Sequence, residues 1–124
     1  MIVGVGLDLT EVPRIAAMLE RWGERFTRKV FTEGERTYAG SRANAAVHLA
    51  ARWSAKEAVL KALCVPSGLS WHEMEVLGGG TEPPRLELSG RAKQAADQLG
   101  IARLYLSLTH TADVASAVVI AESD

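Results

Sequence analysis

The sequence predicts an α+β fold in which a small antiparallel-type sheet packs on one long helix. Strand patterns lie near residues 2–9 and in a hairpin over 104–109 and 114–121, and a helical pattern fills 43–63 between them. The chain has 124 residues, of which 48% are hydrophobic, enough for one small core. We therefore expect a single domain over residues 1–124.

The first strand has two different faces, because side chains alternate along a strand. One face carries Val3, Val5, Leu7 and Leu9, and the other carries Gly4, Gly6 and Asp8. A pair of glycines on one face indicates close approach by a backbone, a helix or a ligand. Thr10 is the better candidate to cap the following helix, which leaves Asp8 as the better candidate for a ligand contact.

A helical pattern follows from about residue 11, and Gly23 is a candidate interruption. Its apolar face consists of Ile15, Met18, Leu19, Trp22 and Phe26. If the helix continues through Gly23, four arginines fall within one stripe beside that face. They are Arg14, Arg21, Arg25 and Arg28. Such a stripe is either an ordinary solvated surface or a docking surface for an acidic partner.

A short helical or turn segment over 33–38 and a break at Gly40 and Ser41 precede the long helix of 43–63. At ~100° per residue, Trp53, Glu57 and Lys61 lie on one side of this helix. The opposite side carries Ala55, Ala58, Val59, Ala62 and Leu63. The Glu57–Lys61 spacing has an ordinary explanation, a solvated ion pair worth ~0.2–0.5 kcal/mol, and a functional one, a site for a charged ligand.

Strands over 74–77 and 85–88 flank residues 78–84, whose glycines and prolines predict an irregular, mobile loop. A helix follows from Ser89 to Gly100. The last hairpin then places His110 at a strand end beside Thr109. Cys64 is the only cysteine, which excludes an internal disulfide, and its apolar neighbours predict a buried thiol.

Charge and hydropathy exclude two classes of partner. The formal net charge is −1 and the pI is about 6.3, so the chain has no global positive field for nucleic acid. The apolar run over residues 1–7 is too short for a membrane span and lacks the basic start of a signal peptide. We expect a cytoplasmic protein with neither nucleic-acid nor membrane partners.

An Asp on a glycine-rich strand, with a Glu and a Lys on a helix face, suits a hard cation and a phosphate. Mg²⁺ prefers oxygen ligands and takes one or two protein carboxylates, together with water and phosphate oxygens. Asp8 and Glu57 are therefore the candidate metal ligands. Lys61 adds a mobile positive charge beside them.

Three motifs carry a family resemblance. They are Gly6–Glu11 followed by Arg14, Trp53–Lys61 with its Lys-Glu-Ala core, and Ser107–His110. In this order and spacing they resemble the holo-acyl-carrier-protein synthases, the small phosphopantetheinyl transferases, over essentially the whole chain. The resemblance implies the 4′-phosphopantetheinyl transferase fold. The sequence departs from the family pattern at Trp53 and Ser54, where Phe-Ala is frequent, and at Cys64–Pro66, where a glycine-bearing turn is more usual.

The resemblance implies a reaction. The protein would transfer 4′-phosphopantetheine from coenzyme A to a serine of apo acyl carrier protein and release adenosine 3′,5′-bisphosphate. Asp8, Glu57 and Lys61 would be the catalytic residues, with Mg²⁺ held by Asp8 and Glu57. The general base stays open among Glu57, a metal-bound hydroxide and an ordered water.

The same resemblance implies contacts with coenzyme A. Lys61 would neutralise phosphate charge, and Thr109 and His110 would lie near the diphosphate. Arg52 and Lys56 are either contacts of the 3′-phosphate or solvated residues, and Arg52 is the preferred candidate. Arg52, Lys61, Thr109 and His110 are thus the expected coenzyme A contacts.

Partners and assembly follow from the resemblance as well. Arg14, and by extension Arg21, would contact acyl carrier protein. The family number of subunits is three, so we expect a homotrimer with its sites at subunit interfaces. A fatty-acid carrier is the default and a polyketide carrier the alternative. Two alternative functions remain open at this point. In them, the protein is either a non-catalytic regulatory module that binds coenzyme A or a nucleotide, or a purely structural subunit.

Overall fold

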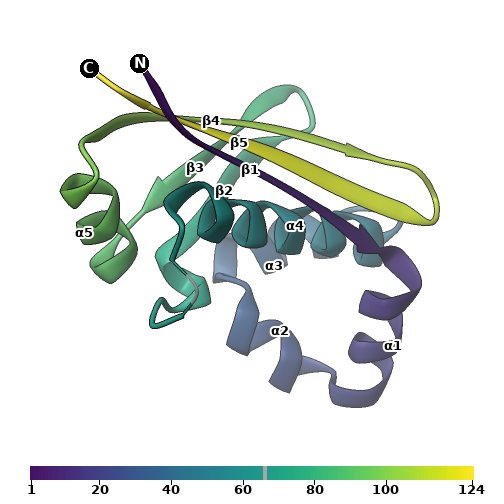
Figure 1. Cartoon of the computed structure of the whole chain (residues 1–124). Coiled ribbons are helices and arrows are strands. Elements are labelled where there is room, and N and C mark those ends of the chain that lie inside the picture. Colours follow the sequence, from purple (N-terminus) through teal and green to yellow (C-terminus); the bar gives the residue numbers. More distant parts are fainter. Residues whose placement is uncertain (66) are drawn as a thin grey trace.

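The computed structural model describes residues 1–65 and 67–124 (Figure 1). In chain order the elements are β1 (Ile2–Glu11), α1 (Val12–Trp22), α2 (Glu24–Val30), α3 (Glu33–Gly40), α4 (Ala45–Leu63), a single helical turn (Trp71–Glu73), β2 (Met74–Gly79), β3 (Glu82–Leu88), α5 (Gly90–Gln98), β4 (Ile101–His110) and β5 (Val114–Ser123). Pro66, which belongs to one of the departures from the family pattern, lies outside the described residues.

The strands form two antiparallel sheets. The larger sheet has the order β1-β5-β4, and the smaller one is the β2-β3 hairpin. Figure 1 shows α4 running along one face of the larger sheet, with α1, α2 and α3 beyond it. The expected α+β class, with an antiparallel sheet on one long helix, is confirmed.

The glycine face of β1 packs directly on α4. A Cβ added at Gly6 would overlap the carbonyl oxygen of Ala58, and one added at Gly4 would overlap that of Ala62. Strand and helix backbones therefore approach each other more closely than any larger side chain allows. The partner that the glycine pair indicated is the long helix of the same chain.

The other face of the larger sheet lies open. Val5, Leu7 and Leu9 are 59%, 63% and 68% exposed, and Tyr105 on β4 is 50% exposed. The surface left for a neighbouring molecule is therefore this aliphatic face, because the glycine-bearing face packs on α4. Small and large side chains do alternate along β1, but the face with Gly4 and Gly6 is the one that meets the core.

Buried residues on α4 belong to two hydrophobic clusters. Ala58, Val59 and Leu63 pack in the cluster under the larger sheet and β2. Val47 and Ala51 pack in the other cluster, with residues of α1, α2 and α3. One helix thus holds the sheet on one side and the short helices on another. No helix in the described part of the chain is long and apolar enough to cross a membrane.

Gly23 does interrupt the helical segment, and the alternative of one continuous helix is wrong. Gly23 has φ 53° and ψ −129°, and its N–H donates to the carbonyl oxygen of Leu19 to end α1. Residue 24 then begins α2 in a new direction. Arg25 and Arg28 consequently lie on a different helix from Arg14 and Arg21.

The expected irregular loop over 78–84 is also wrong. Strand pairing runs through it, with Gly79 opposite Glu82 and a register shift between Leu77 and Gly79. Positive φ values of 76°, 103° and 66° occur at Gly78, Gly79 and Gly80. Residues other than glycine rarely adopt them, and they produce the register shift and the turn. The prolines are tolerated because a two-stranded hairpin has free edges that need no N–H donor.

Candidate active site

Asp8, Glu57 and Lys61 come together where β1 passes over α4, and we call them the carboxylate cluster. Lys61 Nζ lies 3.2 Å from Asp8 Oδ1 and donates to the Leu7 carbonyl oxygen at 2.9 Å. The glycine contact brings the strand close enough for this bond, because Asp8 points toward the helix on the same face as Gly6. The predicted meeting of these side chains is what the structure shows.

A hydroxyl network fixes the position of Asp8. Thr10 Oγ1 donates to Asp8 Oδ2 at 3.2 Å and lies 2.6 Å from Ser54 Oγ. Ser116 Oγ donates to the Asp8 carbonyl oxygen at 2.8 Å. Thr10 is therefore not the helix cap: Glu11 occupies that position, without a side-chain cap bond. Ser54, which departs from the family pattern, thus helps to hold Thr10, the residue that bonds to Asp8.

Glu57 is half-buried beside Asp8. Burial raises the pKa of the Glu57 carboxyl, the negative charge of Asp8 raises it further, and the positive charges of Lys61 and Arg14 oppose the rise. The two carboxylates thus repel each other at this point, a repulsion that a divalent cation would relieve. In residues 1–65 and 67–124 no group of three or more His, Cys, Asp or Glu residues is placed to hold a metal. A pair of carboxylates fits Mg²⁺, which keeps water and phosphate oxygens as its other ligands.

An open pocket of about 430 Å³ adjoins the carboxylate cluster. Its walls are Glu57, Leu60, Lys61, Cys64 and Val65. Cys64 is exposed, so the expectation of a buried thiol is wrong. The residue ends α4 in the left-handed conformation, with φ 56°, and this turns its side chain out of the core.

A second group of polar side chains gathers on another side of α4. It lines a pocket of about 360 Å³, which we call the basic pocket, and comprises Tyr38, Arg42, His48, Arg52 and His110. Arg52 is only 2% exposed, and its guanidinium carbon lies 3.9 Å from the Tyr38 ring centre. One of its terminal nitrogens donates to the Gly78 carbonyl oxygen at 3.0 Å, whereas its buried Nε has no hydrogen-bond partner in the described structure. Burial lowers the pKa of this guanidinium.

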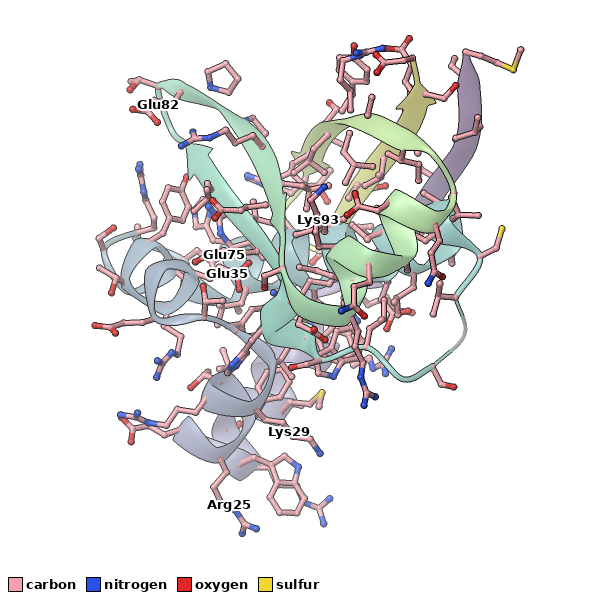
Figure 2. All side chains as sticks on the ribbon, turned by 90° about the vertical axis from the view of Figure 1, so that its left-hand side faces the viewer. Arg25, Lys29, Glu35, Glu75, Glu82 and Lys93 are labelled. Atoms are coloured by element: carbon pink, nitrogen blue, oxygen red, sulfur yellow. The ribbon has the colours of Figure 1, made fainter. Side chains whose placement is uncertain are left out.

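The glycine turn of the β2-β3 hairpin closes over the basic pocket. A Cβ on Gly79 would lie 2.9 Å from Tyr38 Oη, and a Cβ on Gly80 would lie 2.7 Å from a terminal nitrogen of Arg42. In Figure 2, Glu82 stands at the tip of this hairpin. The hairpin that the sequence predicted as a mobile loop is thus a wall of the pocket.

Lys56 is buried. The prediction that it is either solvated or a contact of the 3′-phosphate is therefore wrong. The Lys56 ammonium is fully buried, 2.8 Å from Glu35 Oε1, and donates to the carbonyl oxygens of Trp71 and Met74. Figure 2 shows Glu35 beside Glu75 next to the β2-β3 hairpin. Lys56 points into the protein because it lies on the opposite side of α4 from Lys61. The Lys56 ammonium is therefore not accessible to a phosphate of coenzyme A.

The carboxylate cluster and the basic pocket face different directions in one chain. Arg52 and Glu57 are five positions apart, which turns their side chains by ~140° around the helix axis. His110 points to the inner face of the sheet, where its ring lies 5.6 Å from that of His48. Thr109, one residue earlier, is exposed on the opposite face. The expected coenzyme A contacts thus form no single site within one subunit.

Two of the arginines proposed for docking lie at different places on α1. The guanidinium of Arg14 is 6.0 Å from the Trp53 ring centre, and its charge acts on Glu57. Arg14 therefore borders the carboxylate cluster. The guanidinium of Arg21 lies 5.0 Å from the Trp22 ring centre, and that of Arg25 lies 5.8 Å from it.

A groove is lined by residues of both α1 and α2. These residues are Met18, Trp22, Arg25, Phe26 and Lys29. Figure 2 shows Arg25 and Lys29 projecting from α2 at the end of the molecule away from the hairpin. The groove combines an apolar floor with a basic rim.

Sequence reasoning missed several members of both sites. Tyr38, Arg42 and His48 join the basic pocket only because α3, α4 and β4 meet there. The spacing of His48 and Arg52, four positions apart on a helix, was the one available signal. The support of Asp8 by Ser116, 108 positions later, left no local signal at all.

Comparisons with known proteins show the family to which the chain belongs. The family model for the 4′-phosphopantetheinyl transferase superfamily matches residues 4–119. A holo-[acyl-carrier-protein] synthase of Koribacter versatilis is 44% identical, over 98% of this chain and 99% of that protein.

Two solved structures share the fold. The acyl carrier protein synthase of Mycobacterium tuberculosis superimposes with a TM-score of 0.76 and 38% identity, over 100% of both chains. The holo-[acyl-carrier-protein] synthase of Helicobacter pylori, solved in complex with coenzyme A, superimposes with a TM-score of 0.82 and 27% identity, over 95% of this chain and 99% of that one. Sequence and fold agree over nearly the whole length, and the chain belongs to the 4′-phosphopantetheinyl transferase superfamily.

Proposed function

We propose that the protein transfers the 4′-phosphopantetheine group of coenzyme A to a serine of apo acyl carrier protein. The observation that carries this proposal is the carboxylate cluster, in which Asp8, Glu57 and Lys61 meet beside an open pocket. Phosphoryl transfer requires positioning and charge neutralisation more than covalent chemistry, and these three side chains supply both. Adenosine 3′,5′-bisphosphate is the leaving product.

Asp8 and Glu57 would hold Mg²⁺, which when bound would offset the negative charge of the coenzyme A diphosphate. Their mutual repulsion and the fixed orientation of Asp8 support this assignment. Lys61 reaches the same place from the end of α4 with a flexible, half-exposed chain. It is placed to neutralise phosphate oxygens while the carrier serine attacks the phosphorus nearer pantetheine.

Arg52, Thr109 and His110 are proposed to bind coenzyme A together with Lys61, and Arg52 is assigned to the 3′-phosphate. The unpaired Nε of the buried Arg52 supports an anion there. Because Arg52 and Lys61 face different directions in one chain, one ligand reaches both most directly across a subunit boundary. The exposed aliphatic face of β1 is an apolar surface suited to such a boundary. We therefore propose a homotrimer whose sites join two subunits.

Arg14 and Arg21 are proposed to contact the acyl carrier protein. Arg14 lies beside the carboxylate cluster, so a carrier docked on it would present its serine near the diphosphate. Arg21 extends the positive surface along α1 to the groove at Trp22. An acidic carrier would meet complementary charge over this surface. The carrier of fatty-acid synthesis is the first one to test.

The direct test is incubation with coenzyme A, Mg²⁺ and an apo carrier protein, followed by intact-mass measurement of the carrier. We expect the mass to rise by one phosphopantetheine group, and the control carrier with its serine replaced by alanine to stay unmodified. Coenzyme A binding without any carrier modification would instead support the regulatory-module alternative.

A subunit-mixing experiment tests the shared site. The Asp8→Ala and His110→Ala chains are each expected to lose most activity, because one lacks a carboxylate and the other a coenzyme A contact. Co-refolded mixed oligomers should regain activity, since some interfaces combine the intact half of each chain. Mixed oligomers verified by mass that stay inactive would contradict sites shared between subunits.

A further inference from the structure

His48 lies at the centre of the basic pocket. Its ring meets the rings of Tyr38 and His110 edge to face, with ring centres 5.6 Å apart in both cases. These three residues come from α4, α3 and β4, so packing from three elements fixes the position of the imidazole. No side-chain hydrogen bond of His48 occurs among the described residues, which leaves both ring nitrogens available to a ligand.

The pocket around His48 carries positive charge that no ion pair neutralises in the described part of the chain, although the negative charge of Glu35 acts on Arg52 from farther away. Arg42 and Arg52 both stack near the Tyr38 ring, at 4.5 Å and 3.9 Å from its centre. Neither guanidinium has a carboxylate within 4.0 Å in the described part of the chain. Glu82 is the acidic residue in the pocket lining, and its carboxylate pairs instead with Arg85 at 3.8 Å.

One buried and one exposed guanidinium group, an unpaired Nε on Arg52 and a free imidazole indicate an anion as the missing partner. A phosphate monoester suits this set better than a carboxylate, because it offers more acceptor oxygens and up to two negative charges. Coenzyme A carries one such group, the 3′-phosphate on its ribose. This step rests on the proposed function, which makes coenzyme A the ligand.

We propose that His48 is a specificity-determining residue for the 3′-phosphate of coenzyme A, and that it binds this phosphate in its protonated form. Selection of coenzyme A over its dephosphorylated analogue then depends on proton uptake by the pocket. Arg42 and Arg52 supply constant charge, whereas His48 supplies charge that varies near neutral pH.

The surroundings of His48 set the direction of this effect. Burial lowers the pKa of His48 below its ordinary value, and the neighbouring charges of His110, Arg52 and Arg42 lower it further. Tyr38 and Glu82 complete the titratable groups that line this pocket. A bound phosphate adds negative charge next to the ring and raises the His48 pKa again. Binding therefore takes up a proton, and affinity for the 3′-phosphate rises as the pH falls through the raised pKa.

The test compares coenzyme A with dephospho-coenzyme A by calorimetric binding between about pH 8 and about pH 6, the range in which histidine titrates. The measured quantity is the ratio of the two affinities, which cancels effects on the rest of the ligand. For the unaltered protein we expect this ratio to rise about three- to tenfold on acidification, as for a pKa shift of ~0.5–1 unit. The phosphate itself loses charge near pH ~6, which opposes the rise.

His48→Phe keeps the aromatic contacts with Tyr38 and His110 but cannot take a proton. We expect it to lower the affinity ratio and to remove its rise at low pH, while affinity for dephospho-coenzyme A stays unchanged. His48→Gln, which replaces the ring by a neutral polar group, should behave in the same way. His72→Gln is the matched control, because His72 is exposed and bonds to the Arg28 carbonyl oxygen away from the pocket.

An affinity ratio with the same pH dependence in His48→Phe and the unaltered protein would overturn the role of His48, even though carrier modification continued. An unaltered protein that binds both ligands equally at every pH would overturn it as well. Failure of the proposed function has a different result: no coenzyme A binding, or no carrier modification, by the unaltered protein. Proton uptake measured in buffers of different ionisation enthalpy should be larger for coenzyme A than for its dephosphorylated analogue, and equal uptake contradicts the proposal.

Discussion

The carboxylate cluster and the basic pocket both depend on glycine, but for different reasons. Gly4 and Gly6 have ordinary strand conformations, and each is required because a backbone carbonyl oxygen of α4 occupies the space of a Cβ. Gly79 and Gly80 have positive φ, and the atoms closest to their missing Cβ belong to side chains of Tyr38 and Arg42. The first pair permits close approach of two rigid elements, and the second pair permits a turn.

This difference decides how each region responds to change. Two backbones in contact cannot move apart without displacing β1 from α4, and β1 carries Asp8. A long side chain such as Arg42 can rotate away from an intruding methyl group at modest cost. The strand–helix contact beneath the carboxylate cluster therefore has no room for an added methyl group, whereas the wall of the basic pocket can adjust to one.

The largest effect is expected from Gly6→Ala. The new methyl group would occupy the position of the Ala58 carbonyl oxygen, so β1 must shift or α4 must distort. We expect a loss of ~3 kcal/mol or more in the free energy of unfolding, measured by urea denaturation. Gly80→Ala, which meets the end of the Arg42 side chain, should cost only ~1 kcal/mol, mainly from its positive φ. Equal losses in the two variants would remove the distinction between the regions.

The next effect in size is loss of activity in Asp8→Ala and Glu57→Ala. Each change removes one of two carboxylates proposed to hold Mg²⁺, and we expect transfer to fall about 100-fold or more at ordinary Mg²⁺. Folding should survive, because Thr10 keeps its bond to Ser54 when Asp8 is shortened. The transfer rate of each variant is measured over a series of Mg²⁺ concentrations, and a thermal melt of each variant tests its folding. Glu87→Ala, at an exposed position on β3, is the control, and near-normal turnover in Asp8→Ala would refute the metal site.

The sequence predicted the carboxylate cluster well because its signals are local. A period of two brought Gly4, Gly6 and Asp8 to one face, and a period near four brought Glu57 and Lys61 to one side of the helix. The class of the fold followed from the same periodicities. The direction in which the strand packs did not follow, because alternation shows that two faces differ but not which of them meets the core.

The basic pocket was largely invisible in the sequence because three distant segments form it. His110 belongs to a family motif and Arg52 was one of two candidate contacts of the 3′-phosphate, but no motif includes Tyr38 or His48. The hairpin was misjudged because glycine and proline usually interrupt strands, whereas here positive φ values at Gly78 and Gly79 create the register shift. Conformations of this kind depend on what the turn packs against, which a local pattern does not contain.

A smaller effect is expected from Lys61→Ala. Lys61 is half-exposed, and its ion pair with Asp8 contributes little to folding, so the thermal melt should hardly change. We expect kcat to fall about tenfold or more while the KM for the carrier stays nearly constant, because the charge acts on the phosphate. Lys61→Arg should recover part of the lost rate. A change confined to the carrier KM would move Lys61 from the phosphate to the docking surface.

The smallest effect separates docking from both phosphate-binding regions. Arg14→Glu reverses an exposed charge at the border of the carboxylate cluster, so it should weaken carrier binding about three- to tenfold at low salt. The remaining affinity should depend less on ionic strength, because one attractive contact is gone. Affinity for coenzyme A should change much less, since the two guanidinium groups stacked near Tyr38 in the basic pocket are untouched. Affinities for carrier and coenzyme A measured over a salt series give the answer, and equal losses for both would place Arg14 in the nucleotide site.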